Sequence, residues 1–317
     1  MAHEIEFVNG VAQMAYVGDV PWHGLGKKVS NDLTPLQMLD EAGLNWTVRK
    51  EPSFIILNDE AVEIDRSALI RDRDSKILDI VSNDWNPVQN QEAFEFFNDF
   101  IGAGDMEMHT AGSLKDGQIV WALAKVKDSF ELFKGDRIES YLLFSNFHKY
   151  GFSTDVRFTP IRVVCNNTLA LSLNSKVERM VKISHRKKFE ADNVKEMLGI
   201  AKDKLAQYKE MAVFLGSKMY KEESLVDYFQ RIFPVNGNEP KKDMSRNASR
   251  ALSLIHTQPG AEYAEGSWWQ AFNTVTYMTD HELGRSADTR MQSAWYGTNK
   301  ALKTKALETA VEMAEAA

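Results

Sequence analysis

The hydrophobic pattern of this 317-residue chain changes near residue 188, and no other feature constrains its fold more strongly. Before that point, short runs of alternating apolar and polar residues are separated by turn-forming residues, which is typical of antiparallel strands. After it, apolar residues recur every three or four positions, as on amphipathic helices. We therefore expect an α+β fold with two domains: an antiparallel sheet with packed helices over 1–188, and a helical bundle over 189–317.

Turn and cap residues locate the elements of the first half. Thr34-Pro35 is typical of an N-cap followed by proline at the first helical position, and Gly43 is suited to end that helix. Asp116-Gly117 is a favoured two-residue hairpin turn. The expected elements are a helix over 35–42, strands over 46–57 and 68–81, a helix over 91–101, a hairpin over 106–126, and strands over 138–147 and 152–158.

Thr159-Pro160 repeats the cap-and-proline pattern and predicts a further helix over 159–172, with an apolar face that includes Val164 and Leu169. Arg162 and Asn166 are four residues apart and would share another face of that helix. That face either presents a positive charge beside an amide to a ligand or is an ordinary solvated surface.

The second half reads as helix almost throughout. Apolar residues from Val194 to Leu215 form a long amphipathic stripe, and Ser224 with Asp227 resembles a capping box. Pro234 to Pro240 predicts a loop, because proline, glycine and asparagine are concentrated there. We expect further helices over 246–256, from Ser267 onward, and at the C-terminus.

We expect a globular protein of the bacterial host cytoplasm. Hydrophobic residues make up 44% of the sequence and charged residues 26%, and no apolar run approaches the ~20 residues that span a bilayer. The N-terminus lacks the basic start and apolar segment of a secretion signal. The single cysteine, Cys165, cannot form an internal disulfide, and we expect it to be a small buried hydrophobic residue.

Motifs that carry catalytic chemistry are missing from the sequence. The glycine-rich segment 21–28 has lysine at its end but lacks the spacing and the final Ser or Thr of a phosphate-binding loop. The seven histidines are scattered without the spacing of a metal site. Glu63 with Asp65 leaves open a magnesium-dependent nuclease. We otherwise expect a non-enzymatic protein without a cofactor or bound metal.

Positive charge is concentrated in one segment of an acidic protein. Residues 141–190 contain nine Lys or Arg and three acids, whereas the whole chain has a net charge of −7. Such a local basic surface suits a polyanion such as nucleic acid. The loop from His148 to Gly151 adds aromatic rings to these cations, and Phe152 follows it. Cations that neutralise phosphates, together with aromatic rings that stack on bases, are what a single strand requires.

These considerations define a set of candidate nucleic-acid-binding residues. We expect His148 and Tyr150 to stack on bases and the lysines and arginines to neutralise phosphates, with Arg285 and Arg290 adding contacts from the helical half. The set is His148, Lys149, Tyr150, Arg157, Arg162, Asn166, Arg186, Lys187, Lys188, Arg285 and Arg290.

Several separated motifs also resemble a family of phage and plasmid proteins of unknown function. They include Pro-Trp-His-Gly-Leu-Gly at 21–26, Thr-Ala-Gly at 110–112, and Arg-Phe-Thr-Pro-Ile-Arg-Val-Val-Cys-Asn-Asn-Thr-Leu at 157–169. The resemblance implies a phage or plasmid setting, in which proteins of this size often act in replication or recombination. The order of elements is also similar to that of phage single-strand annealing proteins, which form oligomers on DNA without ATP.

The leading hypothesis is therefore a non-enzymatic, phage-encoded protein that binds single-stranded DNA, acts in annealing or recombination, and can form a homo-oligomer. One alternative is an interaction factor that binds a host or phage protein through Trp268, Trp269 and Trp295. The other is a metal-dependent DNA-processing enzyme, which requires a spatial cluster of acids.

Overall fold

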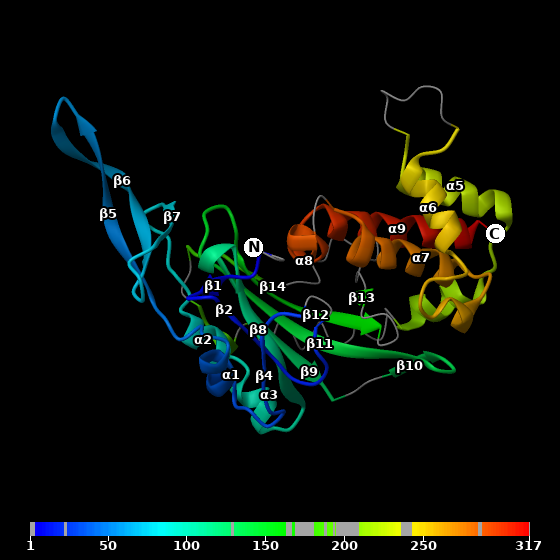
Figure 1. Cartoon of the computed structure of the whole chain (residues 1–317), viewed down its shortest axis with the longest axis horizontal. Helices are drawn as coiled ribbons and strands as arrows, with labels where there is room; N and C mark the ends of the chain where they lie inside the picture. Colours follow the sequence, from blue (N-terminus) through cyan, green and yellow to red (C-terminus); the bar gives the residue numbers. More distant parts are fainter. Residues whose placement is uncertain are drawn as a thin grey trace. The chain divides into compact units, whose positions relative to one another are not determined.

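A computed structural model describes residues 4–21, 24–127, 130–162, 167–168, 181–186, 189–192, 194, 209–235, 243–284 and 287–316 (Figure 1). It confirms the predicted α+β class, with antiparallel sheets in the N-terminal half and helices in the C-terminal half. The chain forms two compact units, which are described separately below. The first comprises 1–127, 141–158 and 180–200, and the second 128–140, 159–179 and 201–317. Separate domains at 1–188 and 189–317 stay a prediction.

The strands belong to three sheets. The largest has the order β13-β12-β11-β9-β8-β3-β4, with β10 added to β11 and β14 to β12, while β5-β6-β7 and β1-β2 form smaller sheets. The strands are β1 (Phe7–Val8), β2 (Val11–Ala12), β3 (Met14–Tyr16), β4 (Lys27–Lys28), β5 (Val48–Leu57), β6 (Glu60–Arg71), β7 (Ile77–Val81), β8 (Met106–Leu114), β9 (Ile119–Val126), β10 (Phe130–Phe133), β11 (Asp136–Phe147), β12 (Thr154–Arg162), β13 (Asn167–Thr168) and β14 (Val181–Ile183).

The described helices fall into an early group and a late group. The early group is α1 (Pro35–Glu41), α2 (Asn90–Glu95), α3 (Asn98–Gly102) and the 3₁₀ turn η2 (Lys115–Gly117). The late group is α5 (Glu222–Ile232), α6 (Arg246–Leu254), the 3₁₀ turn η3 (Ala261–Ala264), α7 (Trp268–Tyr277), the π-helix η4 (Met278–Glu282), α8 (Ala287–Tyr296) and α9 (Thr298–Glu315).

Local signals correctly located α1 and the β8–β9 hairpin. Thr34 Oγ1 accepts a hydrogen bond from the Gln37 backbone at 3.3 Å, and the Gln37 side chain accepts one from Thr34 at 2.8 Å, which completes a capping box. Gly117 closes the hairpin with φ +94°, and a Cβ at this position would lie 2.5 Å from Arg71 Nη1. Glycine is therefore required there by both the backbone conformation and the close approach of an arginine.

Three helix predictions need correction. Thr159–Arg162 is the end of β12 rather than a helix start, because β-branched Thr159 and Ile161 favour strand and proline is tolerated where no ladder donor is needed. The rest of that predicted helix falls largely outside the described residues. The predicted helix over 91–101 is divided into α2 and α3. Helix α5 begins at Glu222 with Lys221 as its N-cap, so Ser224 does not cap it.

A buried ion pair joins two sheets of the first unit. Arg71, at the end of β6, donates to Glu6 Oε1 at 2.6 Å, and each side chain is 2% exposed. Arg71 also makes two hydrogen bonds to Asp74, which hold the pKa of that carboxyl at about 2. The backbone of Glu6 donates to Ser113 in β8, so this ion pair connects the β5–β7 sheet to the large sheet.

A buried polar network lies in the core of the same unit. His148 is fully buried, and its Nε2 lies 3.0 Å from Asn90 Oδ1. Asn146 donates to the Val88 carbonyl at 2.7 Å and accepts from Thr154 at 3.2 Å. The network therefore connects the start of α2 with β11 and β12.

The core of the helical unit is built from its tryptophans and the apolar faces of α5, α6, α7 and α9. Trp268 and Trp269 are 1% and 0% exposed, and Trp269 Nε1 donates to Asp136 at 3.2 Å. Neither ring is available to a partner protein, which corrects their predicted role as interaction anchors. Trp295 is half-buried.

Removing the buried arginine should cost far more stability than removing an exposed one from the same sheet. Arg71→Ala removes the shorter of the two ion pairs of the buried Glu6 carboxylate and leaves only the contact to Arg73 at 3.3 Å, so we expect the free energy of unfolding to fall by about 3 kcal/mol. Arg49 is about half exposed and pairs with Glu51, and Arg49→Ala should cost at most about 1 kcal/mol. Urea denaturation of both variants makes the comparison, and equal losses would contradict a structural role for the ion pair.

Acid should destabilise the fold through His148. Burial, reinforced by the nearby charges of His185 and Arg71, lowers the pKa of His148 from 6.5 to about 3. Between these values the unfolded chain binds a proton that the folded chain does not. The contribution of His148 to stability is therefore complete above pH 6.5 and is lost toward pH 3, at about 1.4 kcal/mol per pH unit.

Urea denaturation across this pH range measures the slope, which His148→Gln should reduce. The exposed His256 provides a matched control, because His256→Gln removes an imidazole that lies in solvent. An unchanged slope in His148→Gln would show that other groups cause the acid sensitivity.

Candidate functional site

The loop from His148 to Gly151 divides between core and surface. His148 at its start is buried against Trp46, with ring centroids 5.3 Å apart, so its predicted stacking on a base is wrong. Tyr150 is 52% exposed, and its backbone N–H donates to Asp79. Lys149 Nζ lies 3.4 Å from Gln118 Oε1 and 5.9 Å from the ring centroid of Phe152. Lys149 and Tyr150 thus remain surface candidates.

Arg157 is a second correction, because the strand that carries it is buried on both faces at this point. Arg157 is 9% exposed and its Nε lies 3.8 Å from Asp155 Oδ1, while Thr154 and Val156 on the other face are fully buried. Adjacent residues of a strand point to opposite faces, and at this point both faces are covered. The arginine therefore does not offer its charge to a polyanion.

The remaining candidates that the structure describes are divided between the two units. Arg186 is exposed and lies 3.4 Å from Asp84, in the first unit. Arg290 belongs to the second unit, where its Nε donates to the Leu283 carbonyl at 3.2 Å. Arg162 is the last residue of β12. Asn166, Lys187, Lys188 and Arg285 lie outside the described residues.

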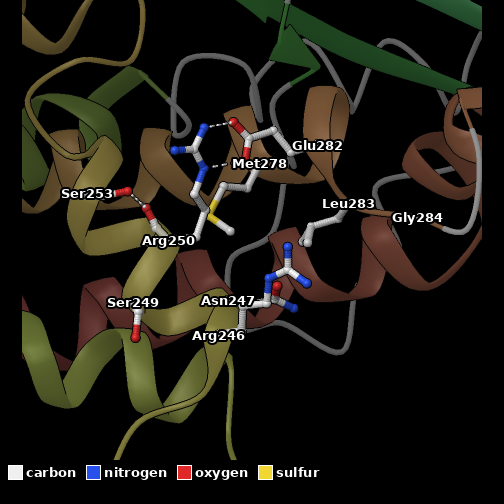
Figure 2. Close-up of a pocket in the computed structure, with 9 residues that line it drawn as sticks. All are labelled: Arg246, Asn247, Ser249, Arg250, Ser253, Met278, Glu282, Leu283 and Gly284. Atoms are coloured by element: carbon white, nitrogen blue, oxygen red, sulfur yellow. Dashed lines mark hydrogen bonds and ion pairs between the residues drawn. The ribbon is translucent and has the colours of Figure 1, made fainter.

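A pocket of about 740 Å³ lies in the helical unit, between α6 and the segment around η4 (Figure 2). We call it the α6 pocket. Its lining is rich in arginine and small polar side chains and consists of Arg246, Asn247, Ser249, Arg250, Ser253, Met278, Glu282, Leu283 and Gly284.

The sequence of α6 explains why polar side chains face this pocket. Ala248, Ala251 and Leu254 are buried against the helical core, which leaves positions 246, 249, 250 and 253 together on the opposite side. Ser245 caps the helix by accepting from the Ala248 backbone at 3.1 Å, and it donates to the Phe233 carbonyl at 2.6 Å. The helix start is thus anchored, and its first backbone N–H groups lie beside the pocket.

Charge in the α6 pocket is only partly neutralised. Arg250 forms a two-pronged ion pair with Glu282, at 2.9 and 2.6 Å, and Figure 2 shows the two side chains facing each other. These hydrogen bonds hold the pKa of Glu282 below its usual value, although burial raises it. The guanidinium of Arg246 has no hydrogen-bond or ion-pair partner among the residues that the structure describes. One arginine that lines the pocket therefore has no counter-ion among the described residues.

The first unit holds a smaller pocket of about 260 Å³ whose lysines are neutralised. Lys76 lies 2.9 Å from Asp116, and Lys115 lies 3.8 Å from Glu4. A pocket of paired charges has less attraction for an anion than one that contains a free arginine. The α6 pocket is accordingly the stronger candidate site.

Arg246 and Arg250 were absent from the candidates proposed from sequence. The helical periodicity of 246–256 places both arginines on the face opposite the apolar residues, and this pattern indicates that they are exposed. It could not show that Glu282, 32 residues away from Arg250, would close the other side of a pocket.

No group of three or more His, Cys, Asp or Glu side chains in the described ranges lies close enough together to hold a metal ion. Among the same residues, no helix combines the length and the apolar composition that crossing a membrane requires.

Comparison with known proteins identifies a family for this chain. No curated protein and no solved structure matches it. Residues 77–301 match the family described as Domain of unknown function (DUF932), and this range includes most of the large sheet, α5, α6, α7 and the whole α6 pocket. The chain therefore belongs to the DUF932 family.

Proposed function

We propose that this protein binds single-stranded nucleic acid without acting as an enzyme and that the α6 pocket holds phosphates of the strand. The observation that supports this most directly is Arg246 at the start of α6, which lines the pocket and has no ion-pair partner in the part of the chain that the structure describes. A phosphate beside Arg246 gains a charge-assisted hydrogen bond and the favourable end of the helix dipole.

The local charge of the pocket matters because the protein as a whole repels polyanions. The net charge of the chain is −7, so binding requires positive groups that are separated from the acids. In the α6 pocket, Arg250 has its counter-ion in Glu282, and Arg246 remains free to replace the counterions of a phosphate. On the first unit, the exposed Tyr150 ring offers a surface on which a base can stack.

Annealing of complementary strands is the activity that this proposal favours. Annealing forms only base pairs and breaks no covalent bond, so it needs phosphate and base contacts but no nucleophile or metal. The resemblance to phage proteins supplies the setting of the proposal, which is recombination in the cytoplasm of a bacterial host.

Arg246→Ala should weaken binding of a fluorescently labelled single-stranded oligonucleotide at low salt. The negative slope of log affinity against log salt concentration should also become shallower by about 0.7, because one phosphate contact is lost. Arg231→Ala is the matched control: this arginine of α5 is also exposed in the second unit but pairs with Asp227 and does not line the pocket. Fluorescence anisotropy over a salt series measures both quantities.

No measurable affinity of the native chain at low salt would overturn the proposal, as would equal effects of the two variants. A second measurement separates binding from annealing. Two complementary strands, labelled with a donor and an acceptor fluorophore, should pair faster with the native protein than with Arg246→Ala. If the protein binds the strand but does not speed up pairing, the pocket is supported as a binding site and annealing is excluded as its activity.

A further inference from the structure

The β5–β6 hairpin is an exposed apolar arm. Figure 1 shows it extending beyond β7, the third strand of its sheet. Only 67–70 of β6 pair with β7, so 53–64 form a two-stranded ribbon. Its large apolar side chains are in solvent: Phe54 is 56% exposed, Ile55 42%, Ile56 68%, Leu57 51% and Val62 41%. An isolated ribbon of this kind is marginally stable in water, and contiguous exposed apolar residues are typical of an interaction surface.

Charge is distributed unequally between the two strands of the arm. Residues 52–57 of β5 contain no ionisable side chain. The turn and β6 carry Asp59, Glu60, Glu63 and Asp65. The turn itself is tight, with Asn58 at φ 51° and Asp59 at φ 66°, as in favoured two-residue hairpins. The outer edge of β5 is therefore apolar and neutral, whereas β6 is acidic.

We propose that the arm pairs with the arm of a second copy of this chain, through the outer edges of the two β5 strands, to form a four-stranded antiparallel sheet. β5 is an edge strand, and Pro52 lacks a backbone donor. The edge available for pairing is therefore 53–57, whose midpoint is Ile55. A two-fold axis at Ile55 places Phe54 opposite Ile56 of the second copy, on one face of the sheet.

Charge favours this arrangement over the alternatives. Pairing through β5 keeps the acids of the two β6 strands at the outer edges, whereas pairing through β6 would bring Glu60 and Glu63 of both copies together. The acidic tip of each arm also approaches the base of β5 in the other copy. There Arg49 and Lys50 outweigh Glu51. A second copy thus covers the apolar edge of β5 and brings positive charge to the acidic tip.

The mass of the full chain in solution tests the proposal. We expect a dimer in light scattering that dissociates on dilution, and a halved mass for Ile55→Lys, which brings two lysines together at the axis. Ala61→Lys is the matched control, because Ala61 is exposed on the same arm but belongs to β6. It should remain a dimer.

Cross-linking is a second test, and its result does not depend on whether Ile55→Lys disturbs folding. In a Cys165→Ser background, Ile55→Cys should form a disulfide between copies on oxidation, since opposite residues have Cβ atoms about 4.5–5.5 Å apart. Ala61→Cys should not, because a further strand separates it from the axis. A monomer at every concentration overturns the proposal. So does a dimer that neither Ile55→Lys nor Ile55→Cys affects, or equal cross-linking at both positions.

Discussion

The buried ion pair between Arg71 and Glu6 is the interaction on which the arrangement of the first unit depends. It joins the sheet that carries the arm to the large sheet, and Gly117 leaves the space that the guanidinium occupies. Because removing two charges from water is costly, the intact pair adds little net stability. Removing one partner is nevertheless strongly destabilising, because the other charge stays buried. The main effect of the pair is to fix positions. The Arg71 guanidinium also lies 5.1 Å from the centroid of the Trp46 ring, and Trp46 contacts His148. One arginine therefore aligns the base of the arm with the polar network of the core.

Part of the basic segment is used for folding. Among its described residues, His148 and Arg157 are buried and Arg186 lies beside Asp84, so these three side chains do not add free positive charge to the surface. An arginine without a partner among the described residues lies instead on α6, outside that segment. Local charge density along a chain therefore overestimates a binding surface wherever strands are buried on both faces, because buried cations need partners of their own.

Elements fixed by contacts within a few residues were predictable, and those fixed by distant contacts were not. Thr34 and Gln37 cap α1 through their own backbone, and Asp116-Gly117 closes a hairpin of adjacent strands, so both are encoded locally. Thr159-Pro160 carries the same helix-start signal, but pairing places these residues in β12. The α6 pocket needs Glu282 from another helix, and no periodicity within α6 indicates that neighbour.

The arm and the α6 pocket have complementary consequences if both proposals hold. One free arginine and a helix N-terminus supply few phosphate contacts, so a single pocket binds a strand weakly. A dimer joined through its arms presents two such pockets in one particle. Once a strand occupies the first, the second binds at a high effective concentration, provided that the strand reaches it. Apolar pairing of the arms would thus raise the affinity of an acidic protein for a polyanion without adding a positive charge to the chain.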